Sequence, residues 1–363
     1  MRILLAMSGG VDSSVVAHML TEEGHEVIGV RFTLWTDPLA PAIAQVLPTK
    51  CCTTQNISRA DKVAKKLKIP LHIVDLEKEF KTTVVDPYLE AHLRGETPNP
   101  CIGCNRNIKF GRLLELMKEY GCKKLATGHY ARVWKETASD GTENYILAEA
   151  KDLRKDQSYY LYGLTQEQLS SVLFPLGDMK KADVYALAKR YDVPLPSSYR
   201  ESQDLCFFPE KKPKAFLMRH LQNALKPGNI VRRDGTIVGT HDGIGLYTVG
   251  QRRGLRVGGL KIPLEVVEKD PQENRLIVAD KGSEVTTSVT LQDLRFVTRT
   301  PEENVPEKFE CRTRSLSAKK TGALTVRGST AIYTFDTPTG PQSKGQSLVL
   351  YRGAEVIGGG VIV

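Results

Sequence analysis

The first half of the chain alternates short apolar runs with segments in which apolar residues recur every three or four positions. The runs predict strands and the periodic segments predict helices. In chain order, the expected elements are a strand at 3–6, a helix at about 13–20, strands at 27–30 and 71–74 on either side of a helix near 60–67, helices near 80–92 and 113–117, and a strand at 124–127. This alternation favours an α/β fold with a doubly wound parallel sheet. Ligands bind such sheets at the carboxyl ends of the strands, so the loop after the first strand is the first place to look for a site.

The pattern changes after about residue 208. Helical periodicity fades, and turn pairs such as Asp234-Gly235 separate short apolar runs. Runs such as 276–278 and 331–334 are typical of short antiparallel strands. We therefore expect a catalytic α/β domain followed by two smaller domains, at residues 1–210, 211–281 and 282–363.

The composition is that of a folded, water-soluble chain. Its 363 residues are 40% hydrophobic and 26% charged, which excludes a disordered or collagen-like protein. No apolar stretch is long enough for a membrane span, and the first residues run directly into Gly-rich sequence without a secretory leader. Seven cysteines are too few for a disulfide scaffold. We expect a cytoplasmic protein with no membrane partner and with reduced thiols.

The net charge of +9 is unevenly distributed. Residues 1–205 hold 27 Lys+Arg and 26 Asp+Glu, whereas residues 206–363 hold 24 and 16. The excess of +8 in the second part favours a polyanionic partner held partly by the C-terminal domains. A basic surface that faces only water is the alternative.

The loop after the first strand reads Met7-Ser8-Gly9-Gly10-Val11-Asp12-Ser13-Ser14. Its glycines let the backbone approach a phosphate closely, and the following helix directs its N-terminal N–H groups at the anion. Asp12 would repel bare phosphate, so we expect it to hold Mg²⁺ between the phosphates. The lysine of a GxxxxGK[ST] loop is missing, which disfavours a kinase or GTPase-type site. A chance turn between strand and helix is the alternative interpretation.

Three cysteines have a distinctive context. Cys101 and Cys104 form a CxxC within Thr97-Pro98-Asn99-Pro100-Cys101-Ile102-Gly103-Cys104-Asn105-Arg106. The two prolines disfavour a helix, so both thiols are expected in a loop ahead of a helix that starts near Ile108. That helix start, Arg106 and Lys109 would lower the pKa of a nearby thiol. A zinc site, a redox pair and a chance spacing all remain open, although no second CxxC or paired histidine completes a zinc set. Cys206 lies where the α/β pattern ends, and the other cysteines are interpreted as structural thiols.

Taken together, these motifs resemble a known family. The Ser-Gly-Gly-x-Asp-Ser loop is similar to the PP-loop of the ATP pyrophosphatases, which cleave ATP between its α and β phosphates. Over the whole chain, the sequence resembles the bacterial tRNA-specific 2-thiouridylases, which replace O2 of the wobble uridine of certain tRNAs with sulfur. The similar strings are 8–14, 97–110, Ala126-Thr127-Gly128-His129-Tyr130-Ala131-Arg132, 155–161, Glu201-Ser202-Gln203-Asp204-Leu205-Cys206-Phe207, 247–255 and 358–362.

The resemblance implies a PP-loop catalytic domain, a small central domain and a C-terminal antiparallel β-barrel. It implies that Cys104 is the catalytic nucleophile and that Cys206 carries a persulfide, with a transient disulfide between them. The implied ATP-binding residues are Ala6, Met7, Ser8, Gly9, Gly10, Val11, Asp12, Ser13, Phe32 and Gly128. The implied target-base residues are Asn99, Pro100 and Cys101, and the implied tRNA contacts are His129, Lys155, Asp156, Gln157, Arg312, Thr313 and Gln346.

The resemblance also implies the reaction and its partners. Mg·ATP adenylates O2 of the uridine, and sulfur from a persulfide carrier protein replaces the adenylated oxygen. A reductant then opens the disulfide. No permanent metal is expected beyond the Mg²⁺ that accompanies ATP at Asp12.

Three alternatives remain. The three thiolates of Cys101, Cys104 and Cys206 would suit a [4Fe–4S] cluster with one open iron. A PP-loop synthetase for a small molecule would need neither the thiols nor the basic C-terminal part. An RNA-binding module with a vestigial nucleotide site would not need Asp12 and the cysteines.

Overall fold

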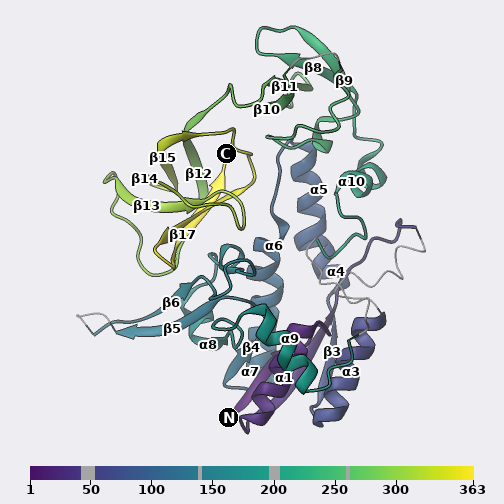
Figure 1. The fold of residues 1–363 in the computed structure, drawn as a ribbon, viewed down its shortest axis with the longest axis vertical. Coiled ribbons are helices and arrows are strands. Elements are labelled where there is room, and N and C mark those ends of the chain that lie inside the picture. The colour runs from purple at the N-terminus through teal and green to yellow at the C-terminus, as the bar shows by residue number, and fades with distance from the viewer. Residues whose placement is uncertain (42–53, 138–140, 196–204, 259–261) are drawn as a thin grey trace.

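The computed structural model describes residues 1–41, 54–137, 141–195, 205–258 and 262–363. Cys51, Cys52 and residues 201–204 of the string before Cys206 lie outside the described residues. The chain forms a parallel α/β domain, a small β-rich domain and a β-barrel (Figure 1). The predicted fold class is confirmed. No helix of the described residues is long and apolar enough to cross a membrane.

The N-terminal sheet has five parallel strands in the order β3-β2-β1-β4-β7. Their bounds are β1 Arg2–Ala6, β2 Glu26–Thr33, β3 Leu71–Asp75, β4 Lys124–Ala126 and β7 Val172–Leu173. In the central register Leu4 lies between Ile28 and Leu125, and Leu4 itself is fully buried. The strand order reverses between β1 and β4, so a crevice for a ligand is expected at the carboxyl end of β1.

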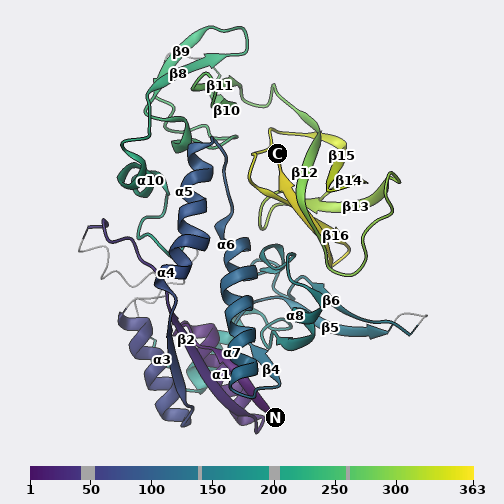
Figure 2. The ribbon, with the colours of Figure 1, turned by 180° about the vertical axis from the view of Figure 1, so that it is seen from behind.

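Helices cover both faces of this sheet. One face packs on α1 Val11–Glu22, α3 Thr54–Leu67 and α9 Lys181–Arg190, and the other on a continuous helical segment made of α6 Pro100–Gly103, the π-helical η2 Cys104–Arg112 and α7 Leu113–Glu119. The short α8 Gln166–Ser171 precedes β7, and a 3-10 turn, η3, spans Ser158–Tyr160. A second helical segment, α4 Glu77–Phe80, η1 Lys81–Val85 and α5 Asp86–Leu93, runs from the sheet to the central domain (Figures 1 and 2).

The prediction of a loop around Cys101 and Cys104 was wrong. The helix begins at Pro100, eight residues before the expected start, and carries both cysteines. Proline is well tolerated there, because the N–H that it lacks has no partner in the first turn of a helix. The side chain of Asn99 caps the helix by accepting the backbone N–H of Cys101 at 3.3 Å.

The central domain contains a four-stranded sheet in the order β10-β11-β8-β9. Its strands are β8 Gly228–Arg232, β9 Ile237–His241, β10 Leu264–Asp270 and β11 Arg275–Asp280, with a 3-10 turn, η4, at Ile244–Leu246. Strand β11 pairs with β10 in the expected antiparallel sense but with β8 in parallel. The preceding helix α10, Lys214–Leu221, was not predicted, although the buried Phe216, Leu217 and Leu221 have helical spacing.

The C-terminal strands form a closed antiparallel barrel. They are β12 Thr286–Phe296, β13 Glu307–Arg312, β14 Lys320–Arg327, β15 Thr330–Thr339, β16 Ser347–Arg352 and β17 Glu355–Ile362. Strand β12 pairs with both β15 and β17, which closes the barrel and removes its free edges. Leu291, Leu324 and Leu348 are fully buried inside it.

The N-terminal region also contributes a hairpin that lies beside the barrel (Figure 1). It consists of β5 Arg132–Thr137 and β6 Glu143–Ala148, and Ala148 pairs with Glu355 of β17. Strand pairing therefore connects segments that were assigned to different domains. The boundaries expected near 210 and 281 stay predictions.

Candidate active site

The loop after β1 lies where the strand order of the parallel sheet reverses. Gly9 has a left-handed backbone with φ +76°, and a Cβ there would lie 1.9 Å from the carbonyl oxygen of Asn56. Only glycine fits this position. The guanidinium of Arg59 in α3 donates to the Gly9 carbonyl at 2.5 Å, and its Nε donates to the Pro194 carbonyl at 3.0 Å. The buried Arg59 therefore ties the loop to α3 and to the segment that follows α9.

The serines of the loop fold it around the start of α1. The hydroxyls of Ser13 and Ser14 donate to the Gly10 carbonyl at 3.2 and 2.9 Å, and the oxygens of Ser8 and Ser13 are 3.3 Å apart. Ser8 is exposed, and Gly10 and Asp12 are partly exposed. The first turn of α1 and the Ser8 hydroxyl thus face a site that can accept an anion.

Asp12 is the acidic residue of this loop. Its Oδ1 accepts the Tyr130 hydroxyl at 2.8 Å and the Lys181 ammonium at 2.6 Å. The side chain of Lys181 is buried, whereas that of Asp12 is 30% exposed. A carboxylate at the edge of a phosphate loop is a suitable ligand for Mg²⁺.

The other two predicted nucleotide residues lie at the same edge of the sheet. A Cβ on Gly128, just after β4, would lie 3.0 Å from the backbone nitrogen of Ser13, so only a very small residue permits this close approach. Phe32 is near the end of β2 and packs against two hydrophobic cores. The structure therefore brings Gly128 directly onto the loop, while a contact between Phe32 and adenine stays a prediction.

The two cysteines of the expected reaction belong to one hydrophobic core. Cys104 is buried in a cluster with Phe207 and Phe208, and the partly buried Cys206 packs against this cluster. The carbonyl of Phe207 accepts the backbone N–H of Asp37 at 3.1 Å. Residues 102 positions apart are thus held in the same part of the molecule, beside the N-terminal sheet.

Asp37 has a side chain with no exposed surface and anchors the segment after Cys206. It pairs with Arg219 and lies 2.8 Å from Nε2 of His220, both in α10. Arg219 also pairs with Glu210. This cluster fixes the chain that follows Cys206 to the loop after β2.

The ligand set of the cluster alternative does not fit this arrangement. Within the described residues, no group of three or more His, Cys, Asp or Glu side chains is placed to hold a metal ion. Cys101, Cys104 and Cys206 are all among those residues. We therefore derive no step through an iron–sulfur cluster.

The predicted target-base residues Asn99, Pro100 and Cys101 form the partly exposed start of the cysteine-bearing helix. Thr97, just before them, is held by both small domains. Its N–H donates to the Lys344 carbonyl at 2.8 Å, its carbonyl accepts the Gln346 amide at 2.6 Å, and its hydroxyl lies 3.4 Å from the ammonium of Lys269. Burial lowers the pKa of Lys269 to about 8.

Several predicted tRNA residues make contacts within the protein. The His129 ring packs near Phe110 and Phe174, and its Nδ1 lies 2.8 Å from the Thr127 hydroxyl. Burial lowers the pKa of His129 well below its ordinary value, so the ring is neutral. The side-chain carbonyl of Gln157 accepts the backbone N–H of Tyr130 at 3.0 Å. Contacts of these residues with tRNA stay predictions.

Asp156 and Arg312, 156 positions apart, meet inside the junction with the barrel. The Asp156 carboxylate accepts the backbone N–H groups of Ala150 and Ser158 and lies 3.3 Å from the Arg312 guanidinium. Arg312 also pairs with Glu149 at 2.8 Å. Thr313 is buried next to Arg312, and Lys155 is partly exposed. The structure thus gathers these residues at one junction, with Asp156 and Arg312 turned toward each other.

Comparison with known proteins matches three family models along the chain. They are described as the tRNA methyl transferase HUP domain at residues 1–210, the tRNA methyl transferase PRC-barrel domain at 214–280 and the aminomethyltransferase beta-barrel domain at 286–362. The tRNA-specific 2-thiouridylase MnmA of Symbiobacterium thermophilum is 37% identical over 99% of this chain and 92% of its own length. That of Geobacter metallireducens is 40% identical over 99% and 96%.

The chain belongs to the tRNA-specific 2-thiouridylase family. Similarity to solved structures is much weaker. One of them, a 4-thiouridine synthetase–RNA complex with bound ATP, is 17% identical, covers 61% of this chain and 50% of its own, and gives a TM-score of 0.35. The family assignment therefore rests on the relatives that align over the full chain.

Sequence reasoning missed three residues of this candidate site. Lys181 contacts Asp12, Arg59 holds the phosphate loop, and Lys269 holds the segment before the cysteines. Each comes from an element distant in sequence from the motif that it supports, and each was one of many lysines and arginines. The only local signal was helical periodicity around Arg59, which predicts a helix but no contact.

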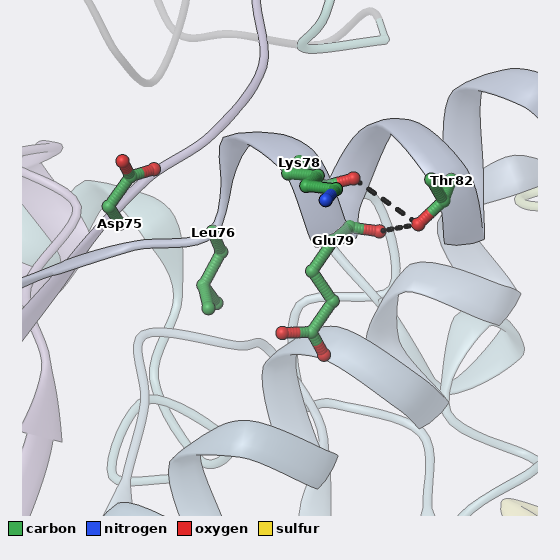
Figure 3. A pocket seen from close by; sticks show the side chains of 5 residues that line it. All are labelled: Asp75, Leu76, Lys78, Glu79 and Thr82. Carbon is green, nitrogen blue, oxygen red and sulfur yellow. Dashed lines mark hydrogen bonds between the residues drawn. The ribbon is translucent and has the colours of Figure 1, made fainter.

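A shallow pocket follows β3 at the start of α4 (Figure 3). It is lined by Asp75, Leu76, Lys78, Glu79 and Thr82, and the Thr82 hydroxyl donates to the carbonyls of Lys78 and Glu79. The pocket is two strands away from β1 and includes none of the predicted thiouridylase site residues.

Proposed function

We propose that this protein catalyses the ATP-dependent 2-thiolation of the wobble uridine of tRNA, with Cys104 as nucleophile and Cys206 as persulfide carrier. One observation carries the proposal. The N-terminal domain holds a phosphate loop where the strand order of its sheet reverses. The same domain holds Cys104 and Cys206, which come from distant parts of the chain and share one core cluster. An ATP site can convert an oxygen into a leaving group. A persulfide on one cysteine supplies the sulfur, and the thiol pair supplies the two electrons that reduce it.

The first half-reaction uses the phosphate loop. The uridine leaves the anticodon stack so that its O2 reaches the α-phosphorus of ATP, as enzymes that modify bases require. O2 bonds to that phosphorus, the bond to the β-phosphate oxygen breaks, and pyrophosphate leaves. Asp12 would hold the Mg²⁺ that neutralises the phosphates, and the N–H groups at the start of α1 would orient them.

The second half-reaction uses the thiols. The terminal sulfur of the Cys206 persulfide bonds to C2 of the uridine, and the C2–O2 bond breaks with release of AMP. The Cys104 thiolate then attacks Sγ of Cys206, which breaks the persulfide S–S bond and leaves the sulfur on C2. Two thiols are thereby oxidised to a Cys104–Cys206 disulfide, and a dithiol reductant restores them. A persulfide carrier protein reloads Cys206.

The two small domains are proposed to support this chemistry by holding tRNA. Their basic excess attracts a polyanion, and Thr97 connects both of them to the start of the cysteine-bearing helix. A tRNA held by these domains would therefore lie next to Asn99, Pro100 and Cys101.

The test is mass spectrometry of nucleosides from tRNA that was unmodified at the start and was incubated with the protein, Mg·ATP and glutathione persulfide. The wild type should form 2-thiouridine. Cys104→Ser and Cys206→Ser should lower its rate at least about 10³-fold, the order typical of a lost nucleophile, while Cys101→Ser keeps substantial activity. Cys122→Ser, which changes a buried thiol in another core, is the matched control.

No 2-thiouridine from the wild type would overturn the proposed function. A different result would overturn only the mechanism: loss of activity in all three variants, together with stoichiometric iron in anaerobically purified wild type, would replace the persulfide route with a cluster.

A further inference from the structure

The short linker between α5 and the cysteine-bearing helix, residues 94–99, is held from two sides. The central domain contacts it on one side, where a Cβ on Gly95 would lie 3.0 Å from the ring of Pro271. The barrel contacts it on the other, where a Cβ on Gly345 would lie 3.2 Å from the backbone of Thr97. Because both neighbours approach so closely, the linker has little room to move independently of the two small domains.

Lys269 of β10 makes the polar contacts on the side of the central domain. Its ammonium donates to the carbonyls of Tyr247 and Glu96 at 2.8 and 3.2 Å, and it lies 3.4 Å from the Thr97 hydroxyl. An ammonium has three N–H donors, so each of them has an acceptor here. One acceptor belongs to the central domain and two belong to the linker. Lys269 therefore fixes the linker relative to the central domain.

The positive charge of Lys269 has no counter-ion nearby. In the part of the chain that the structure describes, no carboxylate forms an ion pair with its ammonium, and the Glu96 carboxylate pairs with Arg94 at 2.9 Å instead. Burial lowers the pKa of Lys269 to about 8, so the group is still a cation at neutral pH. Placing a cation away from water without an ion pair is costly, so folding stability alone does not explain a lysine here.

The other end of the linker is also fixed to the central domain. The Nδ1 of His92 near the end of α5 lies 2.8 Å from the Gly245 carbonyl, and a Cβ on Gly245 would lie 2.5 Å from the His92 carbonyl oxygen. Asn99, only two residues after Thr97, caps the cysteine-bearing helix. A shift of the central domain would therefore reach Asn99 through the contacts of Lys269.

We propose that Lys269 is a positioning residue for the thiolation reaction, a role that rests on the proposed function. It transmits the position of the central domain, as set by bound tRNA, to the start of the cysteine-bearing helix. There Asn99, Pro100 and Cys101 are expected to meet the target base. Lys269 acts through the linker and does not itself touch the RNA.

The experiment compares Lys269→Met, Lys269→Gln and wild type in two measurements. One is the dissociation constant for tRNA, and the other is the rate constant for 2-thiouridine formation in a single turnover at saturating tRNA and Mg·ATP. We expect Lys269→Met to lower the rate constant about 10- to 100-fold, because misplacing reacting groups by about 1 Å costs as much. Its affinity for tRNA should stay near that of the wild type. Lys269→Gln, which keeps N–H donors on a shorter side chain, should lie between the two.

Lys281→Met is the matched control, because it removes one positive charge from an exposed lysine just after β11 of the same sheet. It should leave both quantities unchanged. A wild-type rate constant in Lys269→Met would overturn the role of Lys269, and so would a loss of tRNA affinity with a normal rate constant at saturation. A wild type that forms no 2-thiouridine would instead overturn the proposed function.

Lys269→Met leaves two carbonyls without their donor and can lose its fold for that reason. Thr97→Val tests the same contact from the linker, since it removes only the hydroxyl and keeps the shape of the side chain. It should lower the rate constant at saturating tRNA by about 3- to 10-fold, the order of one lost hydrogen bond, with an unchanged midpoint of thermal unfolding. Equal rate constants in Thr97→Val and wild type would overturn the proposal.

Discussion

The phosphate loop and the junction between residues 149–162 and the barrel are built in opposite ways. The loop takes its glycines, its hydroxyl groups and its carboxylate from seven consecutive residues, and the side chain of Asp12 is 30% exposed. The junction takes Asp156 and Arg312 from segments 156 residues apart, and their side chains are 1% and 10% exposed. The loop is therefore accessible to a ligand, whereas the junction is occupied by its own internal contacts.

This difference distinguishes a local motif that is open to a ligand from a connection between domains whose polar groups contact one another. Tyr159 and Tyr162 reinforce the junction, since both hydroxyls bond to Ser347 of the barrel. Mutations at the loop should therefore change chemistry more than stability, and mutations at the junction should do the reverse.

The largest expected effect is on stability at the junction. Arg312→Met leaves the buried carboxylates of Asp156 and Glu149 without this partner, so we expect the free energy of unfolding to fall by about 3–5 kcal/mol in urea titrations. The control is Lys308, which lies on the same strand β13 as Arg312 and forms an exposed pair with Asp336 of β15, and Lys308→Met should leave the free energy of unfolding nearly unchanged. An Arg312→Met variant of normal stability but weak tRNA affinity would assign Arg312 to the tRNA surface instead.

The next effect concerns chemistry at the loop. Asp12→Asn should lower tRNA-dependent release of pyrophosphate by about 10²- to 10³-fold, the order typical of lost charge stabilisation in a transition state. Its affinity for tRNA should stay near that of the wild type. Asp178→Asn, an exposed carboxylate just before α9, should release pyrophosphate normally. Unchanged turnover in Asp12→Asn would remove Asp12 from the site.

The smallest expected effect is on the pH dependence of stability at the interface between α5 and the central domain. The Nδ1 of His92 lies 2.8 Å from the Gly245 carbonyl, and burial lowers the pKa of His92 to about 4. Between pH 6.5 and 4 the unfolded chain binds a proton at His92 that the folded protein does not, so folding stability falls as pH falls through this window.

His92→Gln should remove about 1–3 kcal/mol of that pH dependence, measured as the difference between urea titrations at pH 6.5 and 4. The Glu96 carboxylate and the Lys269 ammonium, which also act on His92, remain in both proteins. An identical slope in both proteins would show that the pKa of His92 does not differ between the folded and the unfolded protein.

The local pattern predicted much of the fold. The strand at 3–6, the glycine loop and the following helix were all visible, because apolar periodicity and glycine placement are properties of neighbouring residues. The same local reasoning failed at Pro100, where the prolines were interpreted as excluding a helix around the two cysteines. Its position in the first turn, capped by Asn99, made it a helix start instead.

The sequence alone determined the parallel sheet, the phosphate loop with Asp12, and the presence of a CxxC and a later cysteine. Only the tertiary structure decided that Lys181 contacts Asp12, that Cys104 and Cys206 share a core, and that Thr97 is held by both small domains. The reason is physical. Propensity and periodicity act over a few residues, whereas an ion pair between positions 12 and 181 exists only after the chain has packed, and nothing near either residue specifies its partner.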